Sequence, residues 1–487
     1  MTQKTAAVLV VLLVALVPLS CSKSYLDVDP QGQQPETQFF KSQDEAAKAV
    51  NAMYANLRSW SNIAFSPLAV ESIPSDDAEK GSSPGDAEFF NQYDRFTFTS
   101  TEGQTGGFWT GQYQTINLTN QVIDNVPPIQ MDEALKARFL AEAKFIRAYA
   151  YFRLNRAFGG VPLRLHLPVE TSEFNIPRST AAQVYAAIEQ DLTEAAAVLP
   201  QSYGPADIGR ATKGAALALH AKVAMYQRKW SEVLSFTNQV MTLGYSLFPD
   251  YEKLFRIANE NSSESVFEIQ AKFVPGNCDV SNSQYSQVQG VRGSTGGGWG
   301  FNVPTMDLAN AYEAGDPRRD ATIIFRGETT PQGDQIPASG DNPMYNQKSY
   351  VPFGTYVECN EGSEQNIRAI RYADVLLMNA EAANESGNQT QAIASLELVR
   401  ARARQGNNAI LPKVTTTDQT QLRTAIWQER RVELAMESDR FFDLIRQGRA
   451  ATVLGPKGFK AGKNELMPIP QTEIDLSAGV LTQNPGY

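Results

Sequence analysis

The strongest indication of the fold lies in residues 210–247, RATKGAALALHAKVAMYQRKWSEVLSFTNQVMTLGYSL. The stretch divides at residues 227–229 (Gln-Arg-Lys) into two segments in which apolar residues recur at helical spacing. Small side chains in the first segment let two helices approach closely, while Tyr226 and Trp230 fill the space near the turn. The pattern therefore predicts a helical hairpin of the kind found in tetratricopeptide-type repeats.

A single hairpin of this kind cannot bury its apolar face, so the chain needs companion helices. Residues 370–403 repeat the plan with a break at residues 386–388 (Ser-Gly-Asn). Residues 135–158 and 418–446 supply further long helices with a small-residue or amphipathic face. The repeat match is degenerate, so unrelated hairpins in an ordinary all-α core are the alternative.

The helical period largely disappears between residues 245 and 362, where Gly, Pro, Asn, Ser and Gln are dense. Residues 266–270 alternate like a short strand. Structureless connectors of this length are unusual in compact proteins and mostly serve a function. We therefore expect an irregular subdomain that presents a binding surface, followed by helices from residue 367 and an extended tail specified by the prolines around residues 468–470.

The first residues predict export. Lys4 precedes an apolar run at residues 6–17 that is short for a membrane span but suits the core of an export signal. Residues 18–21 (Pro-Leu-Ser-Cys) then resemble a bacterial lipoprotein cleavage box, although Pro18 stands where an aliphatic residue is usual. Cys21 would become a lipidated N-terminus, so that the protein is anchored to a membrane without spanning it. The alternative is an ordinary signal peptide with a chance cysteine.

These patterns divide the chain into segments. Mainly α structure is expected on both sides of the irregular part. The segments are a lipoprotein signal peptide (1–20), a lipidated N-terminus and tether (21–41), an N-terminal helical repeat region (42–244), an irregular ligand-binding subdomain (245–366) and a C-terminal helical repeat region with an extended tail (367–487).

The composition restricts the classes of function. The 487 residues include 43 basic and 53 acidic side chains, a formal charge of −10, and no basic tract, which argues against a nucleic-acid partner. The glycine-rich run at residues 296–300 lacks the Gly-Lys-Ser/Thr ending of a phosphate loop, which argues against nucleotide binding. Cys278 and Cys359 are compatible with a disulfide in an exported protein and equally with two free thiols.

A long motif opens the C-terminal helical part: residues 367–378 (Ile-Arg-Ala-Ile-Arg-Tyr-Ala-Asp-Val-Leu-Leu-Met), followed by Ala380, Glu381 and Ala382. Shorter pieces accompany it. They are residues 25–27 (Tyr-Leu-Asp), 298–301 (Gly-Trp-Gly-Phe), 316–320 (Asp-Pro-Arg-Arg-Asp), Arg430 with Glu433 and Leu434, Arg440 with Asp443 and Leu444, 468–470 (Pro-Ile-Pro) and 483–487 (Gln-Asn-Pro-Gly-Tyr). Together with the lipobox, these motifs resemble the SusD/RagB family of outer-membrane lipoproteins. One departure is Ser438, where the family usually has glycine, and it puts a local turn in doubt.

The resemblance implies four tetratricopeptide-like helical hairpins that support an irregular, loop-rich subdomain with a few short strands. It also implies a lipoprotein that sits on the cell exterior as a lid over a SusC-like TonB-dependent outer-membrane transporter. Such a protein binds an oligosaccharide or polysaccharide without catalysis and hands it to the transporter. The helical repeats would mainly contact the transporter, and the irregular face would hold the sugar. No cofactor is implied beyond the lipid on Cys21.

A glycan site needs flat aromatic rings beside hydrogen-bonding groups, because sugars present apolar ring faces and many hydroxyls. Trp299 lies among glycines that permit close approach of a ligand, and a buried anchoring role is its alternative. Asp76 and Asp77 offer carboxylates from a Pro/Gly loop, or form turns. Arg368 reaches the same face, or makes a structural ion pair. The other candidates are Asn277, Tyr285, Arg292, Phe301 and Tyr350.

Several further residues favour structural roles. Trp109 lies inside a regular helical pattern and is expected in the core, and His220 lies in an Ala-rich helix, which favours packing over a ligand role. No metal site has sequence support beyond acidic loops, and calcium held by oxygen ligands stays open. Spacings of three and four predict a salt-linked helix face, not a catalytic group, for Glu429, Arg430, Arg431, Glu433, Glu437 and Arg440.

Two other classes of function remain alternatives. A secreted glycoside hydrolase would need an acid and base pair, and no fixed-spacing motif singles out two carboxylates. A scaffold whose repeats bind protein would need no sugar site. The sequence does not specify which glycan and linkage would be bound, or whether the cargo is instead a peptide or glycoprotein.

Overall fold

The computed structural model describes residues 39–274, 276–277, 282–293, 297–355 and 362–487. The predicted signal peptide and the tether up to residue 38, together with Cys21, Cys278 and Cys359, lie outside these ranges. The long helices are α2 (Gln43–Leu57), α6 (Gly103–Asn125), α7 (Glu133–Phe158), α8 (Ala181–Val198), α9 (Lys213–Tyr226), α10 (Trp230–Met241), α15 (Tyr372–Glu385), α16 (Gln389–Arg404) and α17 (Gln419–Glu433).

The remaining elements are short and gather mostly around the loops. The short helices are α3 (Trp60–Ile63), α4 (Phe65–Pro67), the π-helix η3 (Leu68–Ser72), α5 (Phe90–Asp94), α11 (Tyr251–Leu254), α12 (Tyr285–Gln289), α13 (Met306–Ala311), α14 (Arg318–Thr322), α18 (Arg440–Arg446), α19 (Ala450–Leu454) and α20 (Gln471–Leu476). The strands are β1 (Ala78–Gly81), β2 (Ser265–Ile269), β3 (Phe301–Pro304), β4 (Ile323–Phe325), β5 (Met344–Asn346) and β6 (Ile367–Arg371). They pair in antiparallel twos: β1 with β3, β2 with β6 and β4 with β5.

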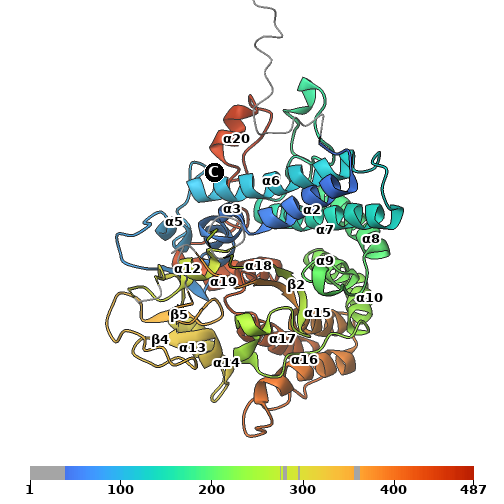
Figure 1. The fold of residues 1–487 in the computed structure, drawn as a ribbon. Helices are drawn as coiled ribbons and strands as arrows, with labels where there is room; N and C mark the ends of the chain where they lie inside the picture. The colour runs from blue at the N-terminus through green and yellow to red at the C-terminus, as the bar shows by residue number, and fades with distance from the viewer. Residues whose placement is uncertain (1–38, 275, 278–281, 294–296, 356–361) are drawn as a thin grey trace, which may run out of the picture.

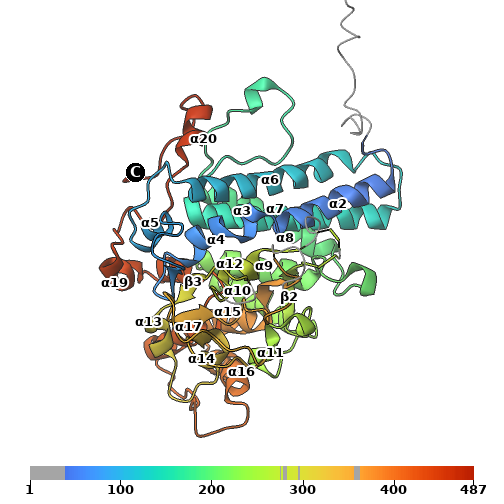
Figure 2. The ribbon, with the colours of Figure 1, turned by 60° about the vertical axis from the view of Figure 1, so that its left-hand side comes forward.

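The long helices form a stack of hairpins. Helix α2 packs on α6, α7 on α8, α9 on α10 and α15 on α16, and successive pairs contact one another through α6 with α7, α8 with α9 and α10 with α15. Figure 1 shows α12, α13, β4 and β5 on the side of the molecule away from α8 and α10, whereas β2 lies against α9. Figure 2 likewise shows α13 and β3 apart from β2. The expected mainly α fold of tetratricopeptide-like hairpins with an irregular region is confirmed.

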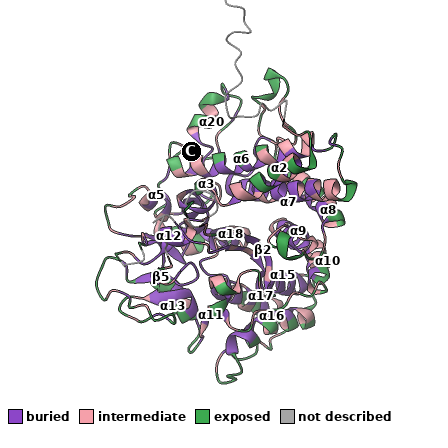
Figure 3. Ribbon diagram, in the orientation of Figure 1, coloured by how far each residue is buried: buried purple, intermediate pink, exposed green. Residues whose placement is uncertain are grey.

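Helix α9 lies at the centre of the stack. Its residues from Gly214 to Met225 are all buried, as a helix covered on every side requires. The Thr212 hydroxyl caps its first turn by accepting a hydrogen bond from the Ala215 N–H at 3.1 Å. Figure 3 shows the buried colour on the inner parts of α7, α9 and α15, with exposed positions on the outer surface of the stack.

The structure corrects three expectations about the C-terminal part. Residues 367–371 form strand β6, not the start of a helix, because they pair with β2 from the irregular region. The expected helix at 418–446 ends at Glu433 and restarts at Arg440. The tail is not simply extended on the surface: it contains α20, and Asn484 is buried, where its side-chain amide donates to the carbonyl oxygens of Phe158 at 3.0 Å and Met467 at 2.7 Å.

The predicted salt-linked face of α17 lies largely in the protein interior. The Glu433 carboxylate is buried and accepts hydrogen bonds from Arg371 at 2.6 Å, from Arg318 at 3.0 Å and from Arg402. Burial opposes ionisation, but these three guanidinium groups outweigh it and hold the pKa of Glu433 well below its usual range. Because Arg318 belongs to α14 and Arg371 ends β6, the network fastens the irregular region to the helical stack.

None of the described helices has the length and apolar content to cross a bilayer.

Candidate functional site

Four aromatic side chains form one continuous cluster at the junction of the N-terminal helices and the irregular region. Trp60, Phe65, Phe89 and Trp299, here called the aromatic face, are each partly accessible, and Trp60 is 38% exposed. The Trp60 and Trp299 ring centroids lie 5.9 Å apart with 52° between the ring planes. Phe65 lies 5.0 Å from Trp60 and 5.9 Å from both Trp299 and Phe89. Tilted rings of this kind offer flat apolar surface on more than one plane.

Two buried rings support the aromatic face from below. Phe301 and Phe90 are 2% and 0% exposed, and each lies 5.0 Å from Phe65. Their own centroids are 5.5 Å apart. Phe301 therefore underlies the aromatic face as packing and is not available to a ligand, which corrects its expected role.

The pairing of β1 with β3 brings the two halves of the aromatic face together. Gly81 opposes Phe301 in this ladder, and the Ser82 N–H donates to the Gly300 carbonyl at 2.6 Å. A side chain at Gly81 has no space, because a Cβ atom there would lie 2.4 Å from the Gly300 carbonyl oxygen. The backbone at Gly81 also has a φ of +69°, which favours glycine. The ladder thus sets Trp299 beside the helix that carries Trp60.

Arg292 supplies a polar edge next to Trp299. Its Nη1 donates to the Ser82 hydroxyl and to Asp86, both at 2.7 Å, and to the Trp299 carbonyl at 3.2 Å. The Arg292 and Asp86 side chains remain 39% and 38% exposed. Because a guanidinium has five N–H donors and a carboxylate accepts several hydrogen bonds, both groups keep capacity for ligand hydroxyls. The structure brings the predicted residues Trp299 and Arg292 together here.

Asp76 and Asp77 are corrected from ligand groups to structural ones. Both are buried: Asp76 accepts two hydrogen bonds from Arg440, and Asp77 accepts one from Arg431 at 2.8 Å. Burial opposes ionisation of Asp76, but Arg440 outweighs it and lowers the pKa; at Asp77 burial prevails and raises the pKa. A carboxylate already used in this way has little left for a sugar hydroxyl.

Arg368 and Tyr350 are also interior groups. The Arg368 guanidinium donates to the backbone carbonyls of Asn366, Leu254 and Arg256 at 2.7 to 3.1 Å. The Tyr350 hydroxyl pairs with Thr330 and Asp334, and the ring is 2% exposed. Both are therefore corrected from ligand contacts to packing and hydrogen bonding. Asn277 is exposed, and its backbone N–H donates to the Val274 carbonyl at 3.1 Å; its role as a ligand group stays a prediction.

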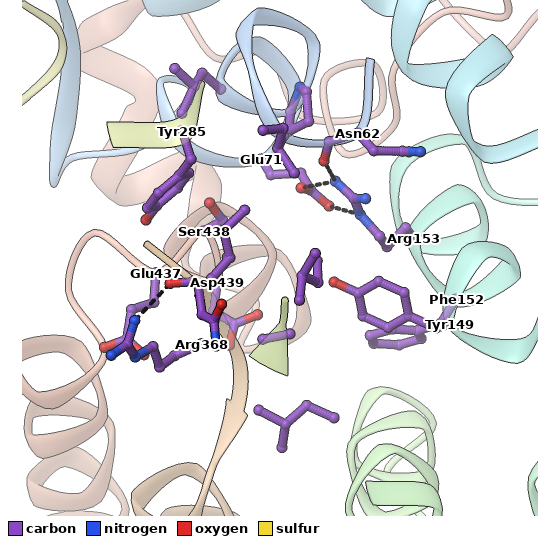
Figure 4. Close-up of a pocket in the computed structure, with 18 of the residues that line it drawn as sticks. Asn62, Glu71, Tyr149, Phe152, Arg153, Tyr285, Arg368, Glu437, Ser438 and Asp439 are labelled. Atoms are coloured by element: carbon purple, nitrogen blue, oxygen red, sulfur yellow. Dashed lines mark hydrogen bonds and ion pairs between the residues drawn. The ribbon is translucent and has the colours of Figure 1, made fainter. Parts of the chain in front are cut away.

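Tyr285 lines an internal cavity instead of the aromatic face. This cavity has a volume of about 90 Å³ and is bordered by charged side chains including Arg153, Glu71 and Arg368. Figure 4 shows Tyr285 and Arg368 on one side of the cavity and the Arg153–Glu71 pair on the other. The volume suits a few water molecules but not an oligosaccharide. Burial raises the pKa of Tyr285 to about 12, so its hydroxyl stays protonated at neutral pH.

Trp60, Phe65 and Phe89 are site residues that the sequence patterns did not indicate. Trp60 stands at the end of the amphipathic pattern of α2, which hides it among helix residues, and the structure starts a separate turn, α3, at that residue. Phe89 precedes α5 inside a loop rich in Pro and Gly. An aromatic residue next to such a break was the available signal. Trp109, expected in the core, is 3% exposed, and His220 is buried as expected.

Family comparisons agree along nearly the entire chain. Residues 263–487 match a profile described as the SusD family, and residues 24–225 match one described as starch-binding and associating with the outer membrane. The SusD-like protein P2 of Formosa agariphila is 30% identical over 506 residues, which cover 98% of each chain. A SusD-like protein of Bacteroides ovatus is 28% identical over 90% of this chain and 81% of its own length.

Two solved structures with the same fold name laminarin or laminarihexaose in their titles. A laminarin-binding SusD-like protein superposes with a TM-score of 0.81 and 32% identity over 92% of this chain and 100% of its own. Surface glycan-binding protein A from Bacteroides thetaiotaomicron, solved with laminarihexaose, has a TM-score of 0.78 and 25% identity over 91% of this chain and 100% of its own.

Proposed function

This chain belongs to the SusD/RagB family of glycan-binding proteins, and on that premise we propose that it captures an oligosaccharide on the aromatic face and delivers it to a SusC-like TonB-dependent transporter. Binding occurs without cleavage. The observation that carries the proposal is the pair of accessible, tilted indole rings of Trp60 and Trp299 with Arg292 and Asp86 at their edge. Rings stack on the apolar faces of sugars, and the charged groups bind their hydroxyls.

The ligand class we propose is a glucan of the laminarin type. Two of the structural relatives are titled by laminarin or by a bound laminarihexaose, and both cover more than nine-tenths of this chain. A tilted arrangement of rings follows a curved chain better than a flat one, because each ring meets a sugar at a different angle.

The cellular arrangement is part of the same proposal. Cys21, behind an export-signal core, carries lipid and holds the protein at the outer membrane facing the exterior. The aromatic face then receives glycan from outside, and the helical stack rests on the transporter. Pull-down of the transporter with the intact protein, and loss of membrane attachment in Cys21→Ser, test these two points.

The glycan proposal is tested by electrophoresis of the intact protein through native gels that contain laminarin, other β-glucans, starch or no polysaccharide. Laminarin is expected to retard the protein. Chromatography of laminarihexaose after prolonged incubation should show no products. Products formed in proportion to protein concentration would instead support the hydrolase alternative, and unretarded migration in every gel would contradict the proposal.

A further inference from the structure

Three consecutive helices of the stack bring two carboxylates and an imidazole together. Glu189 lies on α8, His220 on α9 and Glu232 on α10, and one ligand atom from each lies within 4.8 Å of the other two. This cluster belongs to the helical stack and shares no residue with the aromatic face. Helices α8, α9 and α10 pack on one another in sequence, so a shared ligand would bridge all three.

His220 has a buried ring nitrogen without a hydrogen-bond partner among the described residues. The side chain is 5% exposed and stacks on Phe236 with the ring centroids 4.0 Å apart. Its buried Nδ1 has no hydrogen-bond partner within the described residues. An unpartnered polar nitrogen in the interior is costly and uncommon.

We propose that Glu189, His220 and Glu232 bind a divalent first-row transition metal, with zinc as the reference ion. Imidazole nitrogen and carboxylate oxygen are both zinc ligands, and three protein ligands leave the fourth position to water. Calcium is disfavoured, because it takes six to eight oxygen ligands. Ligand atoms on tetrahedral zinc lie about 3.4 Å apart, since its bonds to nitrogen and oxygen are about 2.0–2.2 Å long. Side-chain rotations of Glu189 and Glu232 would close the remaining gap.

Lys229 is the competing cation at this site. Its ammonium group lies 2.6 Å from Glu189 Oε1, which also accepts a hydrogen bond from Gln227 at 2.7 Å. The Lys229 side chain is 35% exposed, so it can turn into solvent when a metal takes the carboxylate. The metal and the ammonium group therefore compete for Glu189, and removal of Lys229 strengthens metal binding.

A bound metal would stabilise the centre of the stack. It links residues that belong to three helices, and binding to the folded state alone raises the free energy of unfolding by mass action. Zinc should therefore raise the melting temperature of the intact protein in a concentration-dependent way, independently of any glycan.

The test is zinc titration of EDTA-treated intact protein by calorimetry, together with thermal unfolding. One zinc per chain is expected in the wild type. His220→Gln should weaken binding at least about tenfold and abolish the zinc-dependent thermal shift, Glu232→Gln should weaken binding, and Lys229→Met should tighten it. His166→Gln is the matched control. His166 is the other histidine of the chain, and its side chain is exposed and pairs with Asp124.

Cobalt absorption spectra add a readout that does not depend on stability. Cobalt bands present in the wild type and lost in His220→Gln support the site, provided circular dichroism shows both proteins folded. If His220→Gln fails to fold, the zinc affinities of Glu232→Gln and Lys229→Met test the site instead. Equal zinc affinity in wild type and the His220, Glu232 and Lys229 variants, or loss of binding only in His166→Gln, would overturn the proposal. Calcium binding in place of zinc would overturn it as well.

Discussion

Asp76 accepts two hydrogen bonds from Arg440, each 2.7 Å long, and this pair fastens the loop before β1 to helix α18. The adjoining backbone continues the connection, because the Thr305 N–H donates to the Asp77 carbonyl at 3.0 Å just beyond β3. The ion pair and the β1–β3 ladder thus hold the loop between them. Asp76 and Asp77 suit a sugar by residue type, but their carboxylates instead pair with Arg440 and Arg431 and hold the loop that leads into β1.

Replacement of Asp76 by Asn should lower the free energy of unfolding by about 3 kcal/mol, because the buried Arg440 then keeps only Asp77, 3.9 Å away, as a charge partner. Urea denaturation measures this loss. Asp44→Asn is the control. The Asp44 side chain is 76% exposed in its ion pair with Lys48, so loss of this pair should lower the free energy of unfolding by less than about 1 kcal/mol. A similar small loss for both variants would contradict the structural role of Asp76.

Gly81→Ala should disturb the aromatic face from a distance. A Cβ atom at Gly81 would meet the Gly300 carbonyl at 2.4 Å, so the β1–β3 ladder must open and Trp299 must move. We expect weaker glycan retardation together with a loss of stability of about 1–3 kcal/mol. Gly85→Ala in the same loop is the control, since nothing lies within 4 Å of its added Cβ. Unchanged glycan binding in Gly81→Ala would contradict the claim that the β1–β3 ladder positions the aromatic face.

Ser438→Gly should stabilise the protein. Ser438 has a φ of +67°, a left-handed conformation that costs an L-residue about 1–2 kcal/mol and glycine almost nothing. The net gain expected is about 1 kcal/mol, after the greater entropy of glycine in the unfolded chain. Ser82→Gly, at a φ of +58°, should not gain, because the Ser82 hydroxyl bonds both Asp86 and Arg292. A destabilised Ser438→Gly would show that the serine side chain is required there.

Glu260 should give the protein a pH dependence that opposes ordinary acid denaturation. Burial raises its pKa to about 7 in the folded state, above its usual value of 4.5. The folded state therefore holds the Glu260 proton more tightly, and this contribution to stability is present below pH 4.5 and lost as the pH rises to about 7. The difference in unfolding free energy between wild type and Glu260→Gln should fall across this window and level off above it. A difference that is flat from pH 4 to 8 would contradict the raised pKa.

Local sequence patterns predict the hairpins, because the helical spacing of apolar residues indicates α9 and α10 and a polar break marks the turn between them. Local patterns do not predict structure that depends on residues far away in the sequence. Residues 367–371 contain apolar positions that suit a helix, yet they form a strand because they pair with β2. The spacing in α17 predicts ion pairs but not their burial, because Glu433 finds Arg318 and Arg371 from other segments.

The candidate site shows the same division. Trp299 is visible in the sequence because glycines surround it, whereas Trp60 joins the aromatic face through its contacts with Phe65 and with Trp299, which lies 239 positions further along the chain. Residue type likewise favoured Asp76 and Arg368 as ligand groups, and only their buried partners reveal structural roles.

The most direct test of the account is calorimetric titration of laminarihexaose into the intact protein and into Trp60→Ala, Trp299→Ala and Phe174→Ala. Phe174 is the control, an aromatic residue 55% exposed on a loop away from the aromatic face. Each tryptophan replacement should weaken binding at least about tenfold, or about 1.4 kcal/mol, while Phe174→Ala binds as the wild type does. Wild-type affinity in both tryptophan variants would contradict the claim that the aromatic face binds the glycan.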